Sequence, residues 1–310
     1  MKNLTINAPR RLSAAFAVAL LGLTQAGLAH ATCQGMVLHA HRGSPDAPEN
    51  ALSAIKQAVA GPWDGAETDI QQLRDGYWVI HHDAQVGRTL SLQGRRVADL
   101  DSTTWKEIRM KDRKGRVTAE RAPFLTDVAS AASAYTDKVL NVEIKQTNAD
   151  CLPAQQAVST LNQNLPAGNW FLTSIDRRQL QCARRMDANG YMGLIVLDTQ
   201  ALALSSDNRF ARANAARLSA PIIDQAYLSR LQQEIGRPVG IHIDINTLTH
   251  NPGLLPLARQ MAVPVFTYFL GNDREHAQAL AAVRKQSGLL PSGAIINGQP
   301  DTFCSALGSP

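Results

Sequence analysis

The sequence lacks several features that would indicate common classes of protein. No block of lysines and arginines occurs along its 310 residues, which argues against a nucleic-acid partner. None of its four cysteines forms a pair with the C-x-x-C spacing of zinc and redox sites. No G-x-G-x-x-G follows the first expected strand, which weakens a dinucleotide-binding interpretation. Beyond residue 31, no hydrophobic run is long enough to span a bilayer, and no internal repeat or low-complexity segment occurs.

The first 31 residues have the pattern of a secretory signal peptide. Three basic residues precede an apolar run over residues 12–28, and an A-x-A cleavage signal follows at residues 29–31. The uninterrupted apolar part is shorter than the ~20 residues of a membrane-spanning helix, which disfavours an N-terminal anchor. We therefore expect cleavage near Ala31, export to the periplasm or the medium, and a single domain over residues 32–310. Of the 31 Lys and Arg residues three lie in the signal, which leaves 28 against 26 Asp and Glu, a nearly balanced charge.

All four cysteines lie in the part of the chain that would be exported. An even number of cysteines in an oxidising compartment predicts two disulfides, for which three connectivities are possible. Cys151 and Cys182 are expected near the starts of successive helices, which favours that pair. Cys33 with Cys304 then follows by elimination and would join the two ends of the fold.

Short apolar runs alternate with helical patterns, which predicts an α/β fold with a parallel sheet. Eight runs are expected strands: Met36–Ala40, Ala66–Gln71, Trp78–His81, Val139–Ile144, Trp170–Ser174, Met192–Leu197, Val263–Phe269 and Ala294–Ile296. The section over residues 205–250 has no firm assignment, although Pro221–Asp224 and Val239–Ile245 could each add a strand. Eight strands over this length favour a single (β/α)₈ TIM barrel over a doubly wound sheet.

Carboxylates recur on one face of two of these strands. The period of two places Glu67 and Asp69 together on one strand, and Glu143 and Lys145 together on another, each opposite an apolar face. Strands of a parallel barrel are covered on both faces, so the ionisable faces should point into the barrel mouth. Three carboxylates there would repel one another, and a divalent cation would remove the repulsion. Ligation by oxygen alone suits Mg²⁺ or Ca²⁺ better than Zn²⁺.

A less specific interpretation of these carboxylates needs no metal. Glu67 and Asp69 could lie on the exposed face of an edge strand, and Glu143 could simply pair with Lys145. For a single Glu-x-Asp this alternative would be preferred. The pattern occurs in two strands, and two further strand ends carry histidines, so we favour a metal site.

Histidines at the strand ends are candidates for acid and base. Imidazole titrates near neutrality, so His41 and His82 could move protons during cleavage of a phosphodiester. A histidine at a strand end is more often structural, and His39 and His81 are examples to which this applies. The periodicity does not choose between His81 and His82. Arg42 is placed to bind a phosphate oxygen through charge-assisted hydrogen bonds.

The region from about Val37 to Gln146 resembles the glycerophosphodiester phosphodiesterase family. The resemblance lies in the order and spacing of His41-Arg42-Gly43, Pro48-Glu49-Asn50, Glu67-Thr68-Asp69, Arg74-Asp75-Gly76, His82-Asp83, Arg88-Thr89, Phe124-Leu125-Thr126 and Glu143-Ile144-Lys145. It implies a TIM barrel that hydrolyses small glycerophosphodiesters to sn-glycerol 3-phosphate and an alcohol. It also implies a role for each matching residue: Glu67, Asp69 and Glu143 as metal ligands, His41 and His82 (rather than His81) as acid and base, and Arg42 and Lys145 as phosphate-binding groups.

The second half of the chain departs from the family pattern at several positions. Ile175 stands in place of an aromatic residue, and Asn297 stands in place of a threonine. Phe266 replaces a tryptophan, and Gly298 stands where the family usually has an aspartate, both expected where the alcohol half of a substrate could contact the barrel. Two alternatives therefore remain. The substrate could be a lysophospholipid, with the polar, basic Arg109–Arg121 segment meeting anionic headgroups. The barrel could also be catalytically idle and bind phosphodiesters or act as a scaffold, against which the complete set of site residues argues.

Overall fold

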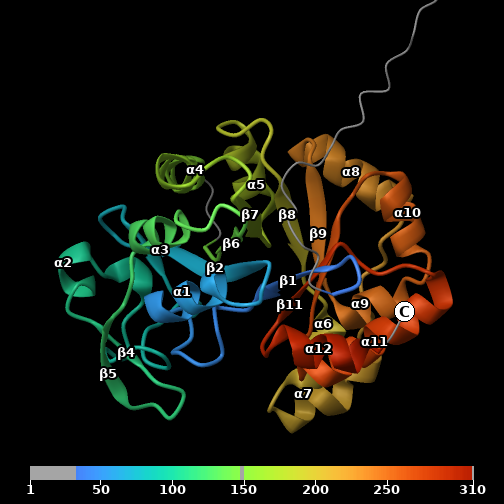
Figure 1. Cartoon of the computed structure of the whole chain (residues 1–310), viewed down its shortest axis with the longest axis horizontal. Coiled ribbons are helices and arrows are strands. Elements are labelled where there is room, and N and C mark those ends of the chain that lie inside the picture. The colour runs from blue at the N-terminus through green and yellow to red at the C-terminus, as the bar shows by residue number, and fades with distance from the viewer. Residues whose placement is uncertain (1–32, 147–149, 309–310) are drawn as a thin grey trace, which may run out of the picture.

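The computed structural model describes residues 33–146 and 150–308, so the expected signal peptide lies outside the described residues. Eight parallel strands form a closed barrel, which confirms the predicted fold class (Figure 1). Around the barrel they are β1 (Val37–Ala40), β2 (Gly65–Gln72), β6 (Val139–Ile144), β7 (Trp170–Ser174), β8 (Met192–Val196), β9 (Val239–Asp244), β10 (Val265–Tyr268) and β11 (Gly293–Ile296). The barrel closes because β1 pairs with β11 on one side and with β2 on the other.

One strand predicted for the barrel lies outside it. β3 (Trp78–Ile80) pairs only with β2, and it does so antiparallel. The physical reason is the short turn at Arg74-Asp75-Gly76, since a parallel strand needs a crossover of a dozen or more residues. The eighth barrel strand is instead β9, which the sequence analysis left unassigned, because His242 and Asp244 interrupt its apolar pattern. Pro221–Asp224 does not form a strand.

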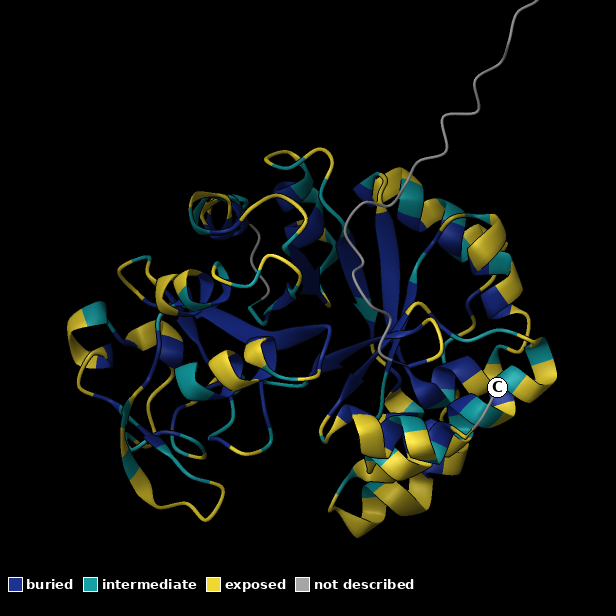
Figure 2. Cartoon of the chain, viewed as in Figure 1, coloured by how far each residue is buried: buried dark blue, intermediate teal, exposed yellow. Residues whose placement is uncertain are grey.

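Helices surround the barrel and bury their apolar sides against the outer faces of the strands (Figure 2). They are α1 (Leu52–Ala60), α3 (Leu125–Ala132), α4 (Leu152–Asn164), α5 (Arg177–Arg184), α8 (Gln225–Ile235), α9 (Ile245–His250), α10 (Leu254–Gln260), α11 (Asp273–Ser287) and α12 (Pro300–Leu307). The outward residues of β6 illustrate the packing, because Leu140, Val142 and Ile144 are almost completely buried. This apolar layer leaves the other face of each strand free to carry polar groups into the barrel.

The segment between β3 and α3 folds as a small unit with its own core. It contains α2 (Ser102–Trp105) and a two-stranded antiparallel sheet of β4 (Arg109–Lys111) and β5 (Val117–Arg121). Trp105, Leu90 and Met110 are at most 1% exposed and belong to a hydrophobic cluster separate from the main core. The basic Arg109–Arg121 stretch is therefore an ordered hairpin held on a small hydrophobic core.

Aromatic and histidine rings fill the inside of the barrel. His39, Phe171, Tyr191, His242 and Phe266 contact one another, and the His242 and Phe266 rings stack with centroids 4.7 Å apart. Burial lowers the pKa of His39 to about 4 and that of His242 to about 3, so both rings are neutral in the folded protein. Phe266 is thus a packing residue of the barrel interior, below the position expected for contact with a substrate.

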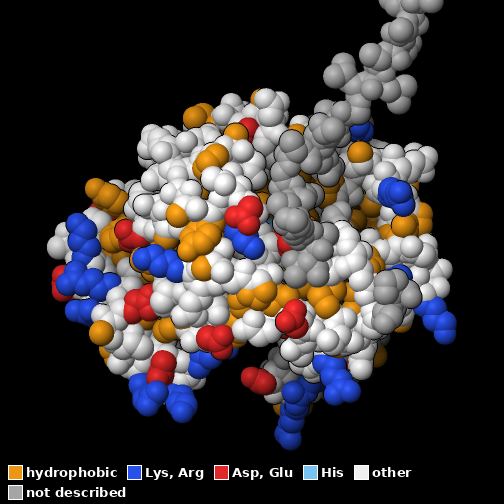
Figure 3. All heavy atoms as spheres, in the orientation of Figure 1, with side chains coloured by type: hydrophobic (Ala, Val, Ile, Leu, Met, Phe, Trp, Pro, Cys, Tyr) orange, Lys and Arg blue, Asp and Glu red, His pale blue; other side chains and the backbone are white. Residues whose placement is uncertain are grey.

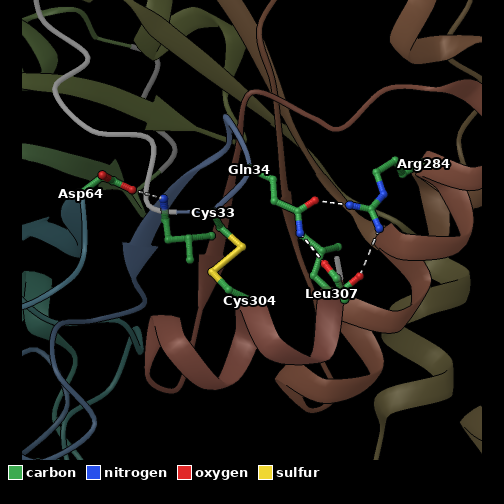
Figure 4. Close-up of a disulfide and its surroundings, with 8 residues drawn as sticks. Cys33, Gln34, Asp64, Arg284, Cys304 and Leu307 are labelled. Atoms are coloured by element: carbon green, nitrogen blue, oxygen red, sulfur yellow. Dashed lines mark hydrogen bonds between the residues drawn. A yellow bond between two sulfur atoms is a disulfide. The ribbon is translucent and has the colours of Figure 1, made fainter. Parts of the chain in front are cut away.

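Two disulfides join the cysteine pairs that the sequence favoured. Cys151 pairs with Cys182, with Cα atoms 5.1 Å apart, and Cys33 pairs with Cys304, with Cα atoms 5.6 Å apart. The second bond ties the residue just before β1 to α12, beside a hydrogen bond from Arg284 to the Gln34 side chain (Figure 4). Among the described residues, no helix is both long and apolar enough to cross a membrane.

A close approach between strands makes Gly193 sensitive to substitution. A Cβ atom there would lie 2.5 Å from the His242 ring, which cannot retreat because it stacks on Phe266. We expect Gly193→Ala to lower the free energy of unfolding by about 1–3 kcal/mol through overpacking. Urea unfolding followed by circular dichroism measures this. Gly253→Ala is the matched control, since nothing lies within 4 Å of its added Cβ; equal effects of the two would contradict the packing argument.

Candidate active site

A cavity of about 350 Å³ opens at the carboxyl ends of the barrel strands. One side of it is ionic and comes from β2, β6 and the loops after β1, β3 and β6: His41, Arg42, Glu67, His82, Glu143 and Lys145. The opposite side is mainly apolar and comes from β8, β10, the loops after β7, β8 and β10, and helix α6 (Thr199–Ser205): Ile175, Ile195, Leu197, Leu202, Tyr268, Phe269 and Leu270. Asn141, Thr173, His242, Ile295 and Asn297 complete the lining. The cavity can therefore hold a molecule with one charged and one apolar end.

Three carboxylates lie together on the ionic side. Glu67, Asp69 and Glu143 each offer an oxygen, and these oxygens all lie within 4.8 Å of one another. Parallel pairing brings this about, because Asp69 and Glu143 are direct neighbours in the register of β2 and β6. Glu67 is 3% and Asp69 1% exposed, so the edge-strand alternative is wrong. The Glu143–Lys145 pair that it included does exist, with Nζ 2.7 Å from Oε1.

The electrostatics of the cluster favour a bound cation. Burial, together with the charges of Asp69 and Glu143, raises the pKa of Glu67 well above its usual value. Burial likewise raises the pKa of Glu143 to about 7, with Asp69 adding to the effect. Burial would also raise the pKa of Asp69, but the charges of Arg42 and Lys145 hold it below its ordinary value. Two of three carboxylates thus resist ionisation, and a hard divalent cation with oxygen ligands would stabilise all three as anions.

Arg42 and Lys145 lie beside this cluster. A positive φ of 57° at Arg42 turns the chain so that its backbone N–H donates to Glu67 Oε2 at 2.9 Å. The guanidinium donates to Glu49 at 2.6 Å, and its Nε is 3.3 Å from Asp69 Oδ2. Lys145 Nζ is 3.6 Å from Asp69 Oδ1 in addition to its contact with Glu143. Two cationic groups therefore flank the position where the three carboxylates converge.

His41 and His82 both line the cavity, and each ring is held through Nδ1. The His41 Nδ1 lies 2.7 Å from Asn297 Oδ1, and the His82 Nδ1 lies 2.8 Å from Asp83 Oδ1. A carboxylate can only accept a hydrogen bond, so His82 donates from Nδ1 and keeps Nε2 for another partner. Burial and the neighbouring Arg42 lower the pKa of His41 to about 4. Burial also lowers the pKa of His82.

A chain of ion pairs fixes His82 and Arg42 at the same time. Arg88 donates to Asp83, which holds His82, and with two nitrogens to Glu49, which holds Arg42. Gln71 donates to the main-chain carbonyls on either side of His82 at 2.9 and 2.7 Å. These contacts come from three different segments, so the positions of the imidazole and the guanidinium depend on one network.

The other two strand-end histidines lie outside the cavity. His39 is buried among the rings of the barrel interior. His81 is 2% exposed, with its Nε2 3.3 Å from Gln85 O and its ring against Trp105. Both are placed for packing. His82, directly after His81, points to the opposite side and lines the cavity.

Sequence analysis gave no role to several residues that position the site. Asn50 donates to Asp69 Oδ2 at 2.7 Å and accepts from the Thr68 hydroxyl, so it anchors the strand that carries two carboxylates. Asp83 and Asn297 orient the two histidines. Asn50 and Asp83 belong to the motifs Pro48-Glu49-Asn50 and His82-Asp83, so their place in these motifs could have pointed to a role in the site. Asn297 lies after β11, and only the closure of the barrel brings it to His41.

Comparison with known proteins identifies the family. A model of the glycerophosphoryl diester phosphodiesterase family matches residues 41–297. The chain belongs to this family. A glycerophosphodiester phosphodiesterase from Caldanaerobacter subterraneus is 36% identical over 108 residues, which cover 34% of this chain and 44% of that protein. Human glycerophosphodiester phosphodiesterase 1 is 48% identical over 71 residues, 23% of this chain and 20% of that protein. The matched segments thus span less than half the length of these relatives.

Solved structures support the same fold over nearly the whole chain. A phosphodiesterase from Oleispira antarctica, in complex with the product sn-glycerol-3-phosphate, has a TM-score of 0.67 at 21% identity and covers 88% of this chain and 97% of its own. A glycerophosphodiester phosphodiesterase from Thermotoga maritima has a TM-score of 0.57 at 19% identity, covering 87% and 97%. The family generally uses a divalent metal, and the acidic cluster of this member suits one.

Gly298, where the family usually has an aspartate, lies against the carboxylate of Asp273. The backbone N–H groups of Asn297 and Gly298 both donate to the Asp273 carboxylate, at 3.0 and 2.5 Å. A Cβ atom at Gly298 would lie 3.0 Å from Asp273 Oδ2, so a carboxylate there would approach a second one. Asp273 thus holds the strand-end loop that carries Asn297, and glycine leaves room for it.

Cation binding by the cluster should be visible in thermal stability. We expect Ca²⁺ or Mg²⁺ at a hundredfold excess over its Kd to raise the Tm of the wild type by about 5 °C, since binding to the folded state alone stabilises it. Glu67→Gln and Asp69→Asn should abolish the shift. Asp207→Asn, at an exposed carboxylate outside the cluster, should retain it. A full shift in Asp69→Asn, measured by differential scanning fluorimetry, would exclude this cation site.

Proposed function

We propose that the protein hydrolyses glycerophosphodiesters to sn-glycerol 3-phosphate and an alcohol, with one divalent cation, Ca²⁺ or Mg²⁺. The observation that carries the proposal is the convergence of Glu67, Asp69 and Glu143 with two histidines in one cavity. The family of the chain and the names of its relatives agree with this activity. Among the alternatives, an idle barrel is disfavoured because no member of the expected set is missing.

The roles follow from the position of each group. A divalent cation held by Glu67, Asp69 and Glu143 would polarise the phosphoryl group and lower the pKa of a nucleophilic hydroxyl or water. Arg42 and Lys145 flank that position and stabilise negative charge on the phosphoryl oxygens. Both are already oriented by carboxylate partners, so little reorganisation is needed when a phosphate enters.

The surroundings of the two histidines differ, and this supports one of them acting as the base and the other as the acid in the first step. Burial and the positive charge of Arg42 nearby favour the neutral form of His41, and they outweigh the hydrogen bond of Nδ1 to the Asn297 amide, which favours the protonated form. Burial also lowers the pKa of His82, but the Asp83 carboxylate at Nδ1 favours the protonated form and partly offsets this lowering. We therefore assign His41 as the base that accepts the proton of the nucleophile, and His82 as the acid that protonates the leaving alkoxide.

The apolar side of the cavity supports a second candidate substrate. A lysophospholipid carries the same phosphodiester on a glycerol that also bears an acyl chain. Ile175, Leu197 and Leu202 provide an apolar surface opposite the charged groups, where such a chain could lie. Hydrolysis of lysophospholipids on their headgroup side would use the same acid, base and cation.

Export is part of the proposal. Two disulfides in one chain are typical of proteins that fold in an oxidising compartment. Together with the signal pattern of residues 1–31, they support a periplasmic or secreted protein with a single phosphodiesterase domain over residues 32–310.

A substrate panel tests the activity directly. We expect the purified protein to release glycerol phosphate from glycerophosphocholine, to lose this activity in EDTA, and to regain it on addition of Ca²⁺ or Mg²⁺, because the cation supplies part of the charge stabilisation. Glycerol phosphate is measured by a coupled dehydrogenase assay, and lysophosphatidylcholine is tested in parallel. Failure to hydrolyse any glycerophosphodiester or lysophospholipid with either cation would favour the idle barrel.

Substitution of the histidines tests the mechanism. We expect His41→Ala and His82→Ala each to lower kcat by about 10²–10⁴-fold, the usual loss for a general acid or base. Asn297→Ala should cost up to about tenfold, since it removes only the hydrogen bond that orients His41. His250→Ala, at an exposed histidine on α9, is the control and should retain full activity. Full activity of His41→Ala would refute the assignment.

A further inference from the structure

Exposed hydrophobic side chains concentrate on one segment next to the cavity. Twelve large hydrophobic residues are exposed in the described part of the chain, and half of them lie within 26 consecutive residues: Leu197, Leu202, Leu204, Phe210, Leu218 and Ile222. We call these six the apolar rim. The segment contains α6 (Thr199–Ser205), α7 (Arg209–Asn214) and a short 3₁₀ turn, η2 (Ala215–Arg217). Isolated exposed apolar residues are ordinary, but a cluster of this kind usually marks a binding surface.

The helix α7 has no packing role that would explain its apolar residue. None of its six residues is buried, and Phe210 is 66% exposed with the Arg209 guanidinium 5.1 Å from its ring centroid. A surface helix normally gains its stability from one buried apolar face. α7 contributes no such face to the fold, so its phenylalanine is available to a partner.

The apolar rim is continuous with the apolar side of the cavity. Leu197 and Leu202 belong to both, being 47% and 43% exposed while they line the cavity. Ile175 and Leu270, also exposed, line the same side. The apolar lining of the cavity therefore extends to the exposed surface of α6, where an acyl chain could lie.

Basic residues surround this surface. Residues 199–222 carry Arg209, Arg212 and Arg217, all exposed, against a single acidic residue, Asp207. On the other side of the barrel, the β4–β5 hairpin carries exposed Arg113 and Lys114 in its turn. Figure 1 places α7 and the hairpin at the lower edge of the molecule, and Figure 3 shows Lys and Arg side chains at the tips of both projections. A negatively charged plane could contact both at once.

We propose that the apolar rim is an interfacial docking surface for an anionic phospholipid membrane, from which it admits lysophospholipids to the cavity. Phe210 and Leu204 would enter the boundary between headgroups and acyl chains, while the arginines contact lipid phosphates. This assigns the apolar side of the cavity to the acyl chain. The docking surface stands on geometry and charge alone, and only the substrate it delivers rests on the proposed phosphodiesterase activity.

Vesicle binding tests the docking surface without reference to catalysis. The full chain should sediment with vesicles of phosphatidylcholine and phosphatidylglycerol, more weakly with pure phosphatidylcholine, and less as salt is raised. Phe210→Ser should weaken binding about tenfold or more, and Arg212→Ser about fivefold, from the usual contributions of one buried aromatic side chain and one interfacial charge. No residue of α7 is buried, so both variants should keep the Tm of the wild type.

Matched controls lie at the opposite end of the barrel. Met186 follows α5 and is 49% exposed, and Lys285 is exposed in the last turn of α11. Met186→Ser and Lys285→Ser change the same kinds of side chain and should leave vesicle binding unchanged. Equal losses in the controls and the rim variants would overturn the proposal, as would a wild type that does not sediment with anionic vesicles.

Kinetics separate docking from the activity itself. Phe210→Ser should hydrolyse soluble glycerophosphocholine at the wild-type rate and lysophospholipid in anionic vesicles about tenfold more slowly, in proportion to its lost binding. Vesicle binding that depends on Phe210 in a protein without any hydrolysis would refute the proposed function and uphold docking. The apolar rim could instead hold two copies of the chain together. A dimer that Phe210→Ser dissociates, in a protein that does not bind vesicles, would overturn the docking proposal.

Discussion

The arrangement of this protein depends on the repulsion among three buried carboxylates. Glu67, Asp69 and Glu143 converge at one end of a closed barrel, the first two buried and the third partly buried, and burial works against the ionisation of Glu67 and Glu143. Arg42 and Lys145 reduce the cost of this arrangement only in part, because they interact mainly with Asp69 and Glu143. The negative charge of the cluster is therefore only partly compensated, and a divalent cation is the simplest group that would supply the missing positive charge.

A second layer of polar contacts holds the reactive groups around this cluster. Glu49, Arg88 and Asp83 connect Arg42 to His82 through four short hydrogen bonds and ion pairs. Asn297 holds His41 from the other end of the chain. Because these partners come from loops after different strands, the chemistry depends on closure of the barrel as much as on the ligands themselves. The interior rings and the Cys33–Cys304 bond contribute to that closure.

The two halves of the chain have different tasks. The first half supplies the charged side of the cavity, and the second half supplies the apolar side and the exposed segment that extends it. Most of the groups that we assign to phosphodiester cleavage come from the first half, and Asn297 of the second half orients His41. Under the proposed function, the second half would decide which alcohol or acyl group can lie beside the phosphate. It is also the half in which the chain departs most from the family pattern, for example at Phe266 and Gly298. Phe266 acts there by supporting His242, which lines the cavity.

The sequence by itself determined a local feature, the period of two that separates Glu67 and Asp69 from their apolar neighbours. It favoured, without fixing them, the barrel class and the cysteine pairs that the structure contains. It was wrong about β3 and left β9 unassigned, because strand periodicity does not report which strand is the neighbour of which, and polar residues inside a barrel disguise a strand. Only the tertiary structure decided that Asn297 meets His41 and that Phe266 lies in the interior. Those contacts join residues far apart in the chain, and no local pattern specifies them.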